Sequence, residues 1–147
     1  MELDQSIDWN LLQYPLHNGV RRLVQHLNLL YQSEPAFSEN DDNYIGFEWI
    51  DCSDADNSIF TFLRKAESGS TLLFAVNATP VPRHSYRIGA PSDGWYEEIL
   101  NTDAGIYGGS NIGNPGKLHT DPIAWQGRSH SLCLTLPPLS TIGLKTT

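Results

Sequence analysis

The spacing of the hydrophobic residues changes along the chain, and this change constrains the fold more than any other feature of the sequence. Over residues 18–31 the apolar residues recur every three or four positions, as on one face of an α-helix. After residue 46 they occur in short runs with a period of two, rich in β-branched and aromatic residues. These runs predict strands at 47–51, 58–65, 71–77, 85–88, 95–101, 129–135 and 141–145. Short strands without helices between them favour a mainly β fold, an antiparallel β-sandwich preceded by one helix.

The predicted helix has one apolar stripe, formed by Val20, Leu23, Val24, Leu27 and Tyr31. Asn18 stands where a side-chain oxygen can cap the first free N–H groups. A single amphipathic helix must bury its stripe against something. Either the stripe packs on the rest of this chain, or its partner lies outside this sequence.

Charge is concentrated in one segment. The chain of 147 residues has a net charge of −8, and the segment 34–56 contains eight acidic residues and no Lys or Arg. With its turn-forming residues, this segment is predicted to be a solvated connector between the helix and the strands. The residue order of a calcium-binding loop is absent from it.

The expected core lies on the strands, at Phe60, Phe62, Leu72, Phe74, Val76, Leu132, Leu134 and Leu136.

Composition excludes several classes of partner. The negative net charge opposes nucleic-acid binding, and no apolar run approaches the length of a membrane span. The first ten residues lack the features of a signal peptide, so we expect a soluble, cytoplasmic protein. Cys52 and Cys133 are too few for a disulfide scaffold and are predicted to be inert thiols.

No catalytic, metal or cofactor site can be assigned from the sequence. Glu97 and Glu98 are adjacent in a predicted strand, so their side chains point to opposite faces and cannot flank one glycosidic bond. Gly116 and Lys117 resemble the end of a P-loop, but the required spacing is absent. The five histidines show no zinc-binding spacing, and His130 lacks the context of a nucleophile elbow.

Several runs of the sequence, in the same order, closely resemble the C-terminal region of 1,4-α-glucan (glycogen) branching enzymes. The resemblance extends from about Ile7 to Leu144. Its most specific segments are Leu16-His17-Asn18-Gly19-Val20-Arg21-Arg22-Leu23-Val24, Gly46-Phe47-Glu48-Trp49-Ile50-Asp51, Asn77-Ala78-Thr79-Pro80-Val81-Pro82-Arg83-His84, Glu98-Ile99-Leu100-Asn101-Thr102-Asp103, Tyr107-Gly108-Gly109-Ser110-Asn111 and Gly127-Arg128-Ser129-His130-Ser131.

The resemblance implies a domain organisation. In that family, part of the α-amylase superfamily, a catalytic (β/α)8 barrel precedes an all-β C-terminal domain. Residues 1–36 would then be the C-terminal remnant of the barrel, with the helix at 18–31 as its last helix, and 37–147 the all-β domain. The Asp nucleophile and the Glu acid/base of the family come from barrel loops upstream, so no catalytic residue is transferred to this chain. The expected partner is the barrel of the same parent chain; the alternative is an independent carbohydrate-binding β-sandwich.

Three tryptophans are candidates for contact with α-glucan, because C–H faces of sugars pack on indole rings. Trp49 is preferred, since Glu48 and Asp51 beside it can accept hydrogen bonds from sugar hydroxyls. The alternative is that Trp49 simply packs beside Phe47 on the same strand face. Trp95 and Trp125 are weaker candidates, equally suited to the core or to anchoring a loop.

Overall fold

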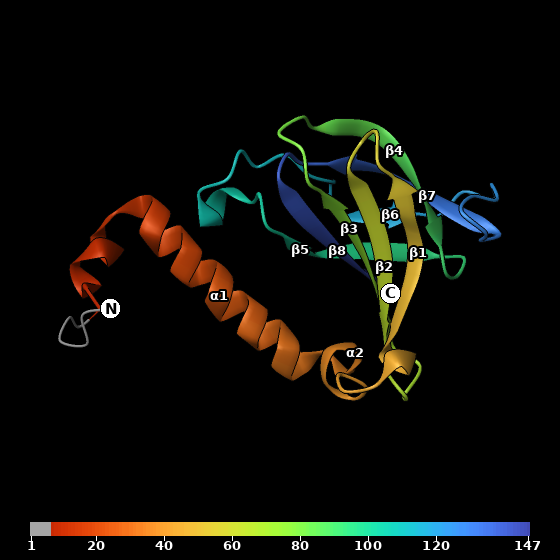
Figure 1. The fold of residues 1–147 in the computed structure, drawn as a ribbon, viewed down its shortest axis with the longest axis horizontal. Helices are drawn as coiled ribbons and strands as arrows, with labels where there is room; N and C mark the ends of the chain where they lie inside the picture. Colours follow the sequence, from red (N-terminus) through yellow and green to blue (C-terminus); the bar gives the residue numbers. More distant parts are fainter. Residues whose placement is uncertain (1–6) are drawn as a thin grey trace.

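The computed structural model describes residues 7–147 and shows a β-sandwich with one long helix beside it (Figure 1). The predicted mainly β fold is therefore confirmed. The helical elements are η1 (Trp9–Gln13), α1 (Pro15–Ser33), α2 (Pro35–Ser38), η2 (Tyr44–Gly46) and η3 (Gly105–Tyr107). The strands are β1 (Phe47–Asp54), β2 (Ile59–Lys65), β3 (Thr71–Asn77), β4 (Arg83–Ala90), β5 (Trp95–Asn101), β6 (Lys117–His119), β7 (His130–Leu136) and β8 (Ser140–Thr146).

The strands form two antiparallel sheets. The larger sheet has the order β1-β2-β3-β8-β5-β6, and β4 pairs with β7 in the smaller sheet. Every strand predicted from the period of two is present. The sequence analysis missed β6, because three residues are too few to show a period.

The main core lies between the two sheets. It contains the predicted Leu132, Leu134 and Leu136, together with Leu63 and Leu73 from the larger sheet. The other predicted core residues point away from this core, because alternate residues of a strand face opposite sides. Leu72 and Phe74 belong to a second cluster on the outer face of the larger sheet, and Phe62 is only partly buried there. Phe60 and Val76, also predicted as core, are likewise only partly buried.

Aromatic rings form a continuous row across the outer face of the larger sheet. The rings of Phe74 and Phe62 stack with centroids 5.2 Å apart, and those of Phe62 and Phe47 with centroids 5.3 Å apart. Trp49 meets Phe47 and Phe60 edge to face at 4.9 and 6.3 Å. We call these five residues the aromatic row. It runs from the centre of the sheet to the edge strand β1.

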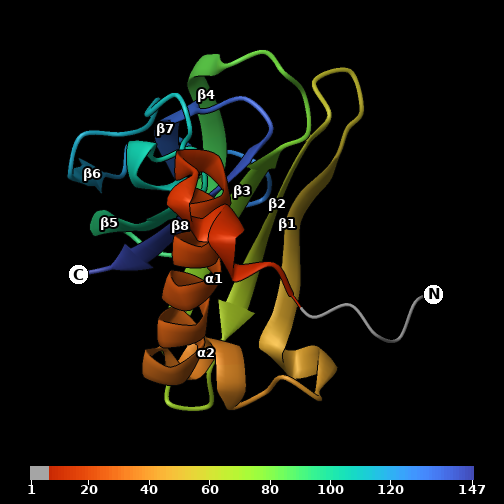
Figure 2. The same ribbon diagram turned by 90° about the vertical axis from the view of Figure 1, so that its left-hand side faces the viewer.

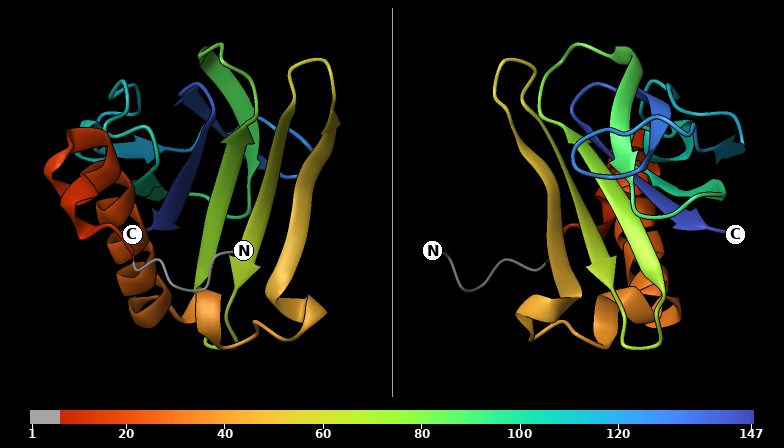
Figure 3. Two further views of the ribbon diagram at one scale, coloured as in Figure 1. Left: turned by 60° about the vertical axis from the view of Figure 1, so that its left-hand side comes forward. Right: turned by 90° about the vertical axis from the view of Figure 1, so that its right-hand side faces the viewer.

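Helix α1 lies against only part of this outer face. Figure 2 shows it in front of β8, with β1 uncovered to one side, and Figure 3 shows it along one flank of the sandwich. Leu23 and Leu30 of α1 pack on the second cluster, and Gly19 contacts the backbone of Tyr107 in η3. His26 Nδ1 lies 2.7 Å from the hydroxyl of Tyr107. The inward face of α1 is therefore narrow and mixed in character.

The structure corrects two predictions about this helix. It begins at Pro15, with no side-chain cap, and the Asn18 side chain instead accepts a hydrogen bond from Arg21. Proline fits the first turn because its missing N–H would be unpaired there. Of the predicted stripe, only Leu23 packs on the second cluster. Leu27 and Tyr31 lie beside the sheet but are exposed, and Val20 and Val24 are exposed as well.

The acidic connector is also less solvated than predicted. Its first residue, Glu34, is buried and accepts two hydrogen bonds from Lys145 of β8, at 2.9 and 2.8 Å. Ala36 in α2 is fully buried, and Asn40 is buried as well. The local sequence predicts solvated charges, because the lysine that pairs with Glu34 lies 111 residues away and leaves no local signal.

This ion pair gives a stability prediction. Lys145→Met is expected to lower the free energy of unfolding by about 2 kcal/mol, because it leaves a buried carboxylate without its partner. Adding Glu34→Leu should recover most of the loss, since both charges are then gone. Urea unfolding of the two variants measures the difference. Equal destabilisation by the single and the double variant would contradict a role for the unpaired charge.

Candidate functional site

Helix α1 exposes a row of apolar side chains. Leu16, Val20, Val24, Leu27 and Tyr31 follow one another along the helix, and we call them the α1 stripe. Val20 is 61% exposed and Val24 is 51% exposed. Beside the stripe, a groove of about 400 Å3 separates α1 from the outer face of the larger sheet. Its lining is mostly apolar and includes Leu27, Tyr31, Phe37, Phe62 and Phe74. A contiguous apolar surface of this kind is typical of a protein–protein contact.

The three candidate tryptophans are not brought together. Trp49 lies on the edge strand β1, and Trp95 begins β5, four strands away, or about 19 Å at the usual strand spacing. Trp125 lies in the loop before β7 and forms an isolated bridge with Arg128. All three are about half exposed, at 50%, 51% and 47%.

Each indole has a different environment. Trp49 packs beside Phe47, as the alternative interpretation held, yet half of its surface stays open to solvent. Trp95 meets the ring of His119 edge to face, with centroids 4.9 Å apart. Trp125 lines a cleft of about 880 Å3 together with residues of β1 and β4.

The loop that holds Trp125 is fixed to β1 and β4. Arg128 pairs with Glu48, and the side-chain amide of Gln126 donates to Asp51 Oδ2 at 2.7 Å. The Gly89 N–H donates to Gln126 Oε1 at 2.9 Å. A Cβ at Gly89 would lie 2.7 Å from the carbonyl oxygen of Trp125, so only glycine allows the loop to lie this close.

Electrostatics reinforce this anchoring. Hydrogen bonds from Lys65 and Arg128 lower the pKa of Glu48. Hydrogen bonds from Ser53, and a weaker one from Gln126, lower the pKa of Asp51. Both side chains are therefore carboxylates at neutral pH and accept hydrogen bonds without donating any.

The Glu48 anchor predicts a pH dependence. Because the pKa of Glu48 is lower in the folded protein than its ordinary value of 4.5, the carboxylate stabilises the fold above that value. The contribution is lost as the pH falls through the lowered pKa. Urea unfolding should show wild type more stable than Glu48→Gln near neutral pH, with the difference disappearing in acid. A difference that is constant with pH would contradict the assignment.

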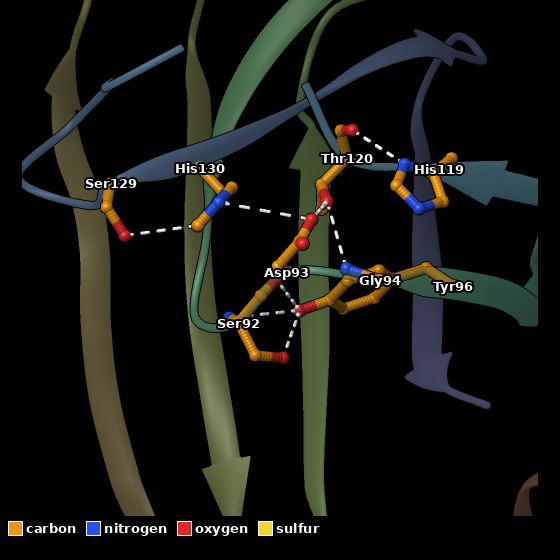
Figure 4. Close-up of polar contacts among 8 residues, drawn as sticks. All are labelled: Ser92, Asp93, Gly94, Tyr96, His119, Thr120, Ser129 and His130. Carbon is orange, nitrogen blue, oxygen red and sulfur yellow. Dashed lines mark hydrogen bonds and ion pairs between the residues drawn. The ribbon is translucent and has the colours of Figure 1, made fainter. Parts of the chain in front are cut away.

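One polar cluster has the composition of a serine-nucleophile triad (Figure 4). Ser129 Oγ lies 3.1 Å from His130 Nδ1, but His130 Nε2 is 3.9 Å from Asp93 Oδ1, too far for a hydrogen bond. That carboxylate oxygen instead accepts from the hydroxyl of Thr120 at 2.6 Å, and the Gly94 N–H donates to the same hydroxyl. The cluster fastens the β4–β5 turn to the segment after β6; the histidine is not oriented as a base.

The acidic pairs considered from the sequence are also accounted for. Glu97 is exposed, 3.7 Å from Lys117, while Glu98 accepts hydrogen bonds from Asn114. Asp41 pairs with Arg64.

Within residues 7–147, no group of three or more potential metal ligands comes together. Among the helices described, none has the length and apolar character needed to cross a membrane.

Comparison with known proteins identifies the fold family. A family model described as "Alpha amylase, C-terminal all-beta domain" matches residues 49–147. The chain belongs to this family. The same fold occurs in the catalytic module of the pneumococcal protein SpuA, with a TM-score of 0.58 and 18% identity over 95% of this chain and 19% of that one.

Relatives named 1,4-alpha-glucan branching enzyme GlgB match almost the whole chain of this α-amylase C-terminal domain. The protein from Paramagnetospirillum magneticum is 51% identical over 97% of this chain and 19% of its own length. The one from Aquifex aeolicus is also 51% identical, over 97% of this chain and 23% of its own length. The chain thus spans about a fifth of the length of these relatives, and the match includes α1, which lies outside the family model.

Sequence reasoning missed how α1 is held. Gly19, His26 and Tyr107 make the contact between the helix and η3, and none of them was a candidate. An isolated glycine within a helical pattern was the available signal, because such a glycine usually has a packing reason.

Proposed function

We propose that the chain is the C-terminal, non-catalytic β-domain of a 1,4-α-glucan branching enzyme, and that the α1 stripe binds the catalytic barrel of the same parent chain. The observation that carries the proposal is the exposed stripe itself. The helix holds four of its five stripe residues at half exposure or near it, with a mostly apolar groove beside them. Water is a poor environment for such a surface.

The similar proteins support the proposal that the catalytic barrel covers the α1 stripe. The chain corresponds to about a fifth of the proteins named branching enzyme, so most of such a protein lies outside this sequence. In the proposed division, residues 1–36 end the barrel and residues 37–147 form the β-domain. Catalysis then belongs to the barrel, and this chain contributes stability to the parent enzyme. Two exposed free thiols, Cys52 and Cys133, suit the reducing cytoplasm that the proposal assigns to the parent.

Glucan contact by this domain is part of the proposal. Trp49, Trp95 and Trp125 remain its candidates, and their half-exposed indoles support it, because each leaves a ring face or edge for a sugar. The Trp49 ring is held by three aromatic neighbours. Sugar binding would therefore cost little additional side-chain entropy.

A chimera tests the proposal. The segment of the Aquifex aeolicus relative that matches this chain is deleted, and this chain is inserted in its place. The truncated relative is expected to be insoluble or inactive in the iodine-stain assay on amylose, and the chimera is expected to recover branching activity. This chain alone should show none, because in the proposed division the catalytic carboxylates belong to the barrel.

The outcomes separate the two candidate functions. A truncated relative that is fully active without any C-terminal segment, or a chimera that stays inactive although it is folded, would overturn the domain proposal. The independent binding module would then be the better description. Activity of this chain alone, abolished by a point mutation in it, would overturn the non-catalytic role.

A further inference from the structure

The cleft beside Trp125 is lined by residues of β1 and β4. In Figure 1 these strands lie on the side of the sandwich away from α1. The cleft is formed where the end of β1, the start of β4 and the loop before β7 meet, from residues up to 75 positions apart. Its volume of about 880 Å3 is in the range of small-molecule sites. The α1 stripe and the groove beside it contribute no residue to the cleft.

The backbone around the cleft is held in unusual conformations. Ser85 has φ 55° and Gln126 has φ 48°, both in the left-handed region that non-glycine residues rarely occupy. Ser85 lies within a register shift of the β4–β7 pair, between Arg83 and Tyr86. Irregularities of this kind redirect side chains and are common beside binding sites.

One cation in the cleft has no partner. Within residues 7–147, Arg83 forms no ion pair within 4.0 Å and no side-chain hydrogen bond, and its Nε is buried without a hydrogen-bond partner. The neighbouring Arg87 does have partners, since its Nη1 donates to Asp121 and Ser131 at 2.8 and 2.7 Å. Because no group of the described residues engages the terminal nitrogens of Arg83, they are free to donate hydrogen bonds to a ligand in the cleft.

The charges of the cleft select a neutral ligand. Asp51, Asp54, Arg83 and Arg87 all line the cleft, so an anion would meet two carboxylates and a cation two guanidinium groups. Hydrogen bonds from Tyr86 and Asn57 keep the pKa of Asp54 low, and the carboxylate stays charged. A neutral ligand rich in hydroxyl groups suits such a mixture, because hydroxyls both donate and accept.

We propose that this cleft binds a short segment of neutral α-glucan, with the Trp125 indole packed on a sugar face and Arg83, His84 and Ser85 donating to sugar hydroxyls. The choice of an α-linked glucan as the ligand rests on the proposed function. The geometry of the cleft does not depend on that function. Because the α1 stripe lies elsewhere, the cleft stays open when the barrel is docked. A bound glucan would then be tethered beside the enzyme, which raises its effective concentration.

Titration of the 15N-labelled chain with maltoheptaose tests the site by NMR. The four indole N–H signals are assigned with single Trp→Phe variants, and the sugar is added to about 10 mM, tenfold above a Kd of about 1 mM. We expect the Trp125 signal to shift most. Trp125→Ala should weaken binding by about tenfold or more, and Arg83→Met, which keeps the aliphatic stem, by at least about threefold.

Trp9→Ala is the control, because its indole is exposed and belongs to η1, outside the cleft. Thermal unfolding of each variant confirms that it is folded. No shift of any indole signal, or binding that is lost in Trp49→Ala and kept in Trp125→Ala, would overturn the cleft assignment. So would equal binding of cellohexaose, whose β-linked chain has a different shape.

Failure here is distinguishable from failure of the proposed function. A chimera that recovers branching activity, from a chain that binds no maltoheptaose, overturns only the cleft. A chain that binds at Trp125 but gives an inactive, folded chimera supports the cleft and overturns the docking of the barrel.

Discussion

Val20→Glu combined with Val24→Glu is expected to reduce the branching activity of the chimera by on the order of a hundredfold, the largest effect predicted for any surface change in this chain. In the proposed interface both valines are covered by the barrel, and burying two unpaired carboxylates costs several kcal/mol. In the chain alone both side chains are more than half exposed, so the same change should leave its free energy of unfolding almost unchanged. The iodine-stain assay and urea unfolding measure the two effects.

The control places the same two charges elsewhere on the helix. Gln25 and Gln32 are exposed and lie about 120–140° around the α1 axis from Val20, at 100° per residue. Gln25→Glu with Gln32→Glu is therefore expected to leave the chimera active. Equal loss of activity in both double variants would point to net charge or helix stability as the cause, and the stripe would no longer be the docking surface.

The existence of the strands could be predicted from the sequence, but the side that each strand turns to the main core could not. Residues 71–77 alternate between the main core and the outer cluster, and both sets are apolar. A run of that kind shows that a strand exists without showing which face is the core. Leu72 and Phe74 are accordingly buried, as predicted for core residues, but in the cluster on the outer face of the sheet.

The orientation of α1 could not be predicted from its period. The most regular apolar stripe faces outward, and the inward face uses Gly19, Leu23, His26 and Leu30. Periodicity measures how apolar a face is and not what covers it. In the proposed function, the most regular stripe belongs to the contact with the barrel and not to the contact with the sandwich.

The cleft was beyond sequence reasoning for a different reason. Trp125 was a candidate, but Arg83 was not, because an arginine in a strand usually has an acidic partner or solvent. Its unpaired state follows from the register shift in β4 and from the engagement of Asp54 by Asn57 and Tyr86. The contact between Asp54 and Tyr86 joins positions 32 residues apart and leaves no local pattern.

Gly19→Ala should release the N-terminal half of α1 from the sandwich, although alanine is the better helix former. At an exposed helix position, replacing glycine by alanine gains about 1 kcal/mol. At Gly19, however, the new Cβ would collide with the carbonyl oxygen of Tyr107 and lie 2.6 Å from its carbonyl carbon. Backbone atoms cannot rotate away, so overpacking of about 1–3 kcal/mol opposes the helix propensity and the contact opens.

Two readouts follow the release. Amide hydrogen exchange in the first turns of α1 should become faster, while exchange in β3 and β8 stays slow, because the main core is untouched. Burial raises the pKa of Tyr107 above its ordinary value of 10.0, so exposure of the phenol should bring the pKa back toward that value. Asn28→Ala, on the exposed side of the same helix, isolates the gain in propensity. If Gly19→Ala instead slows exchange in α1 as Asn28→Ala does, the helix does not lie against η3. A different face of α1 would then be exposed, and the α1 stripe would no longer be the docking surface.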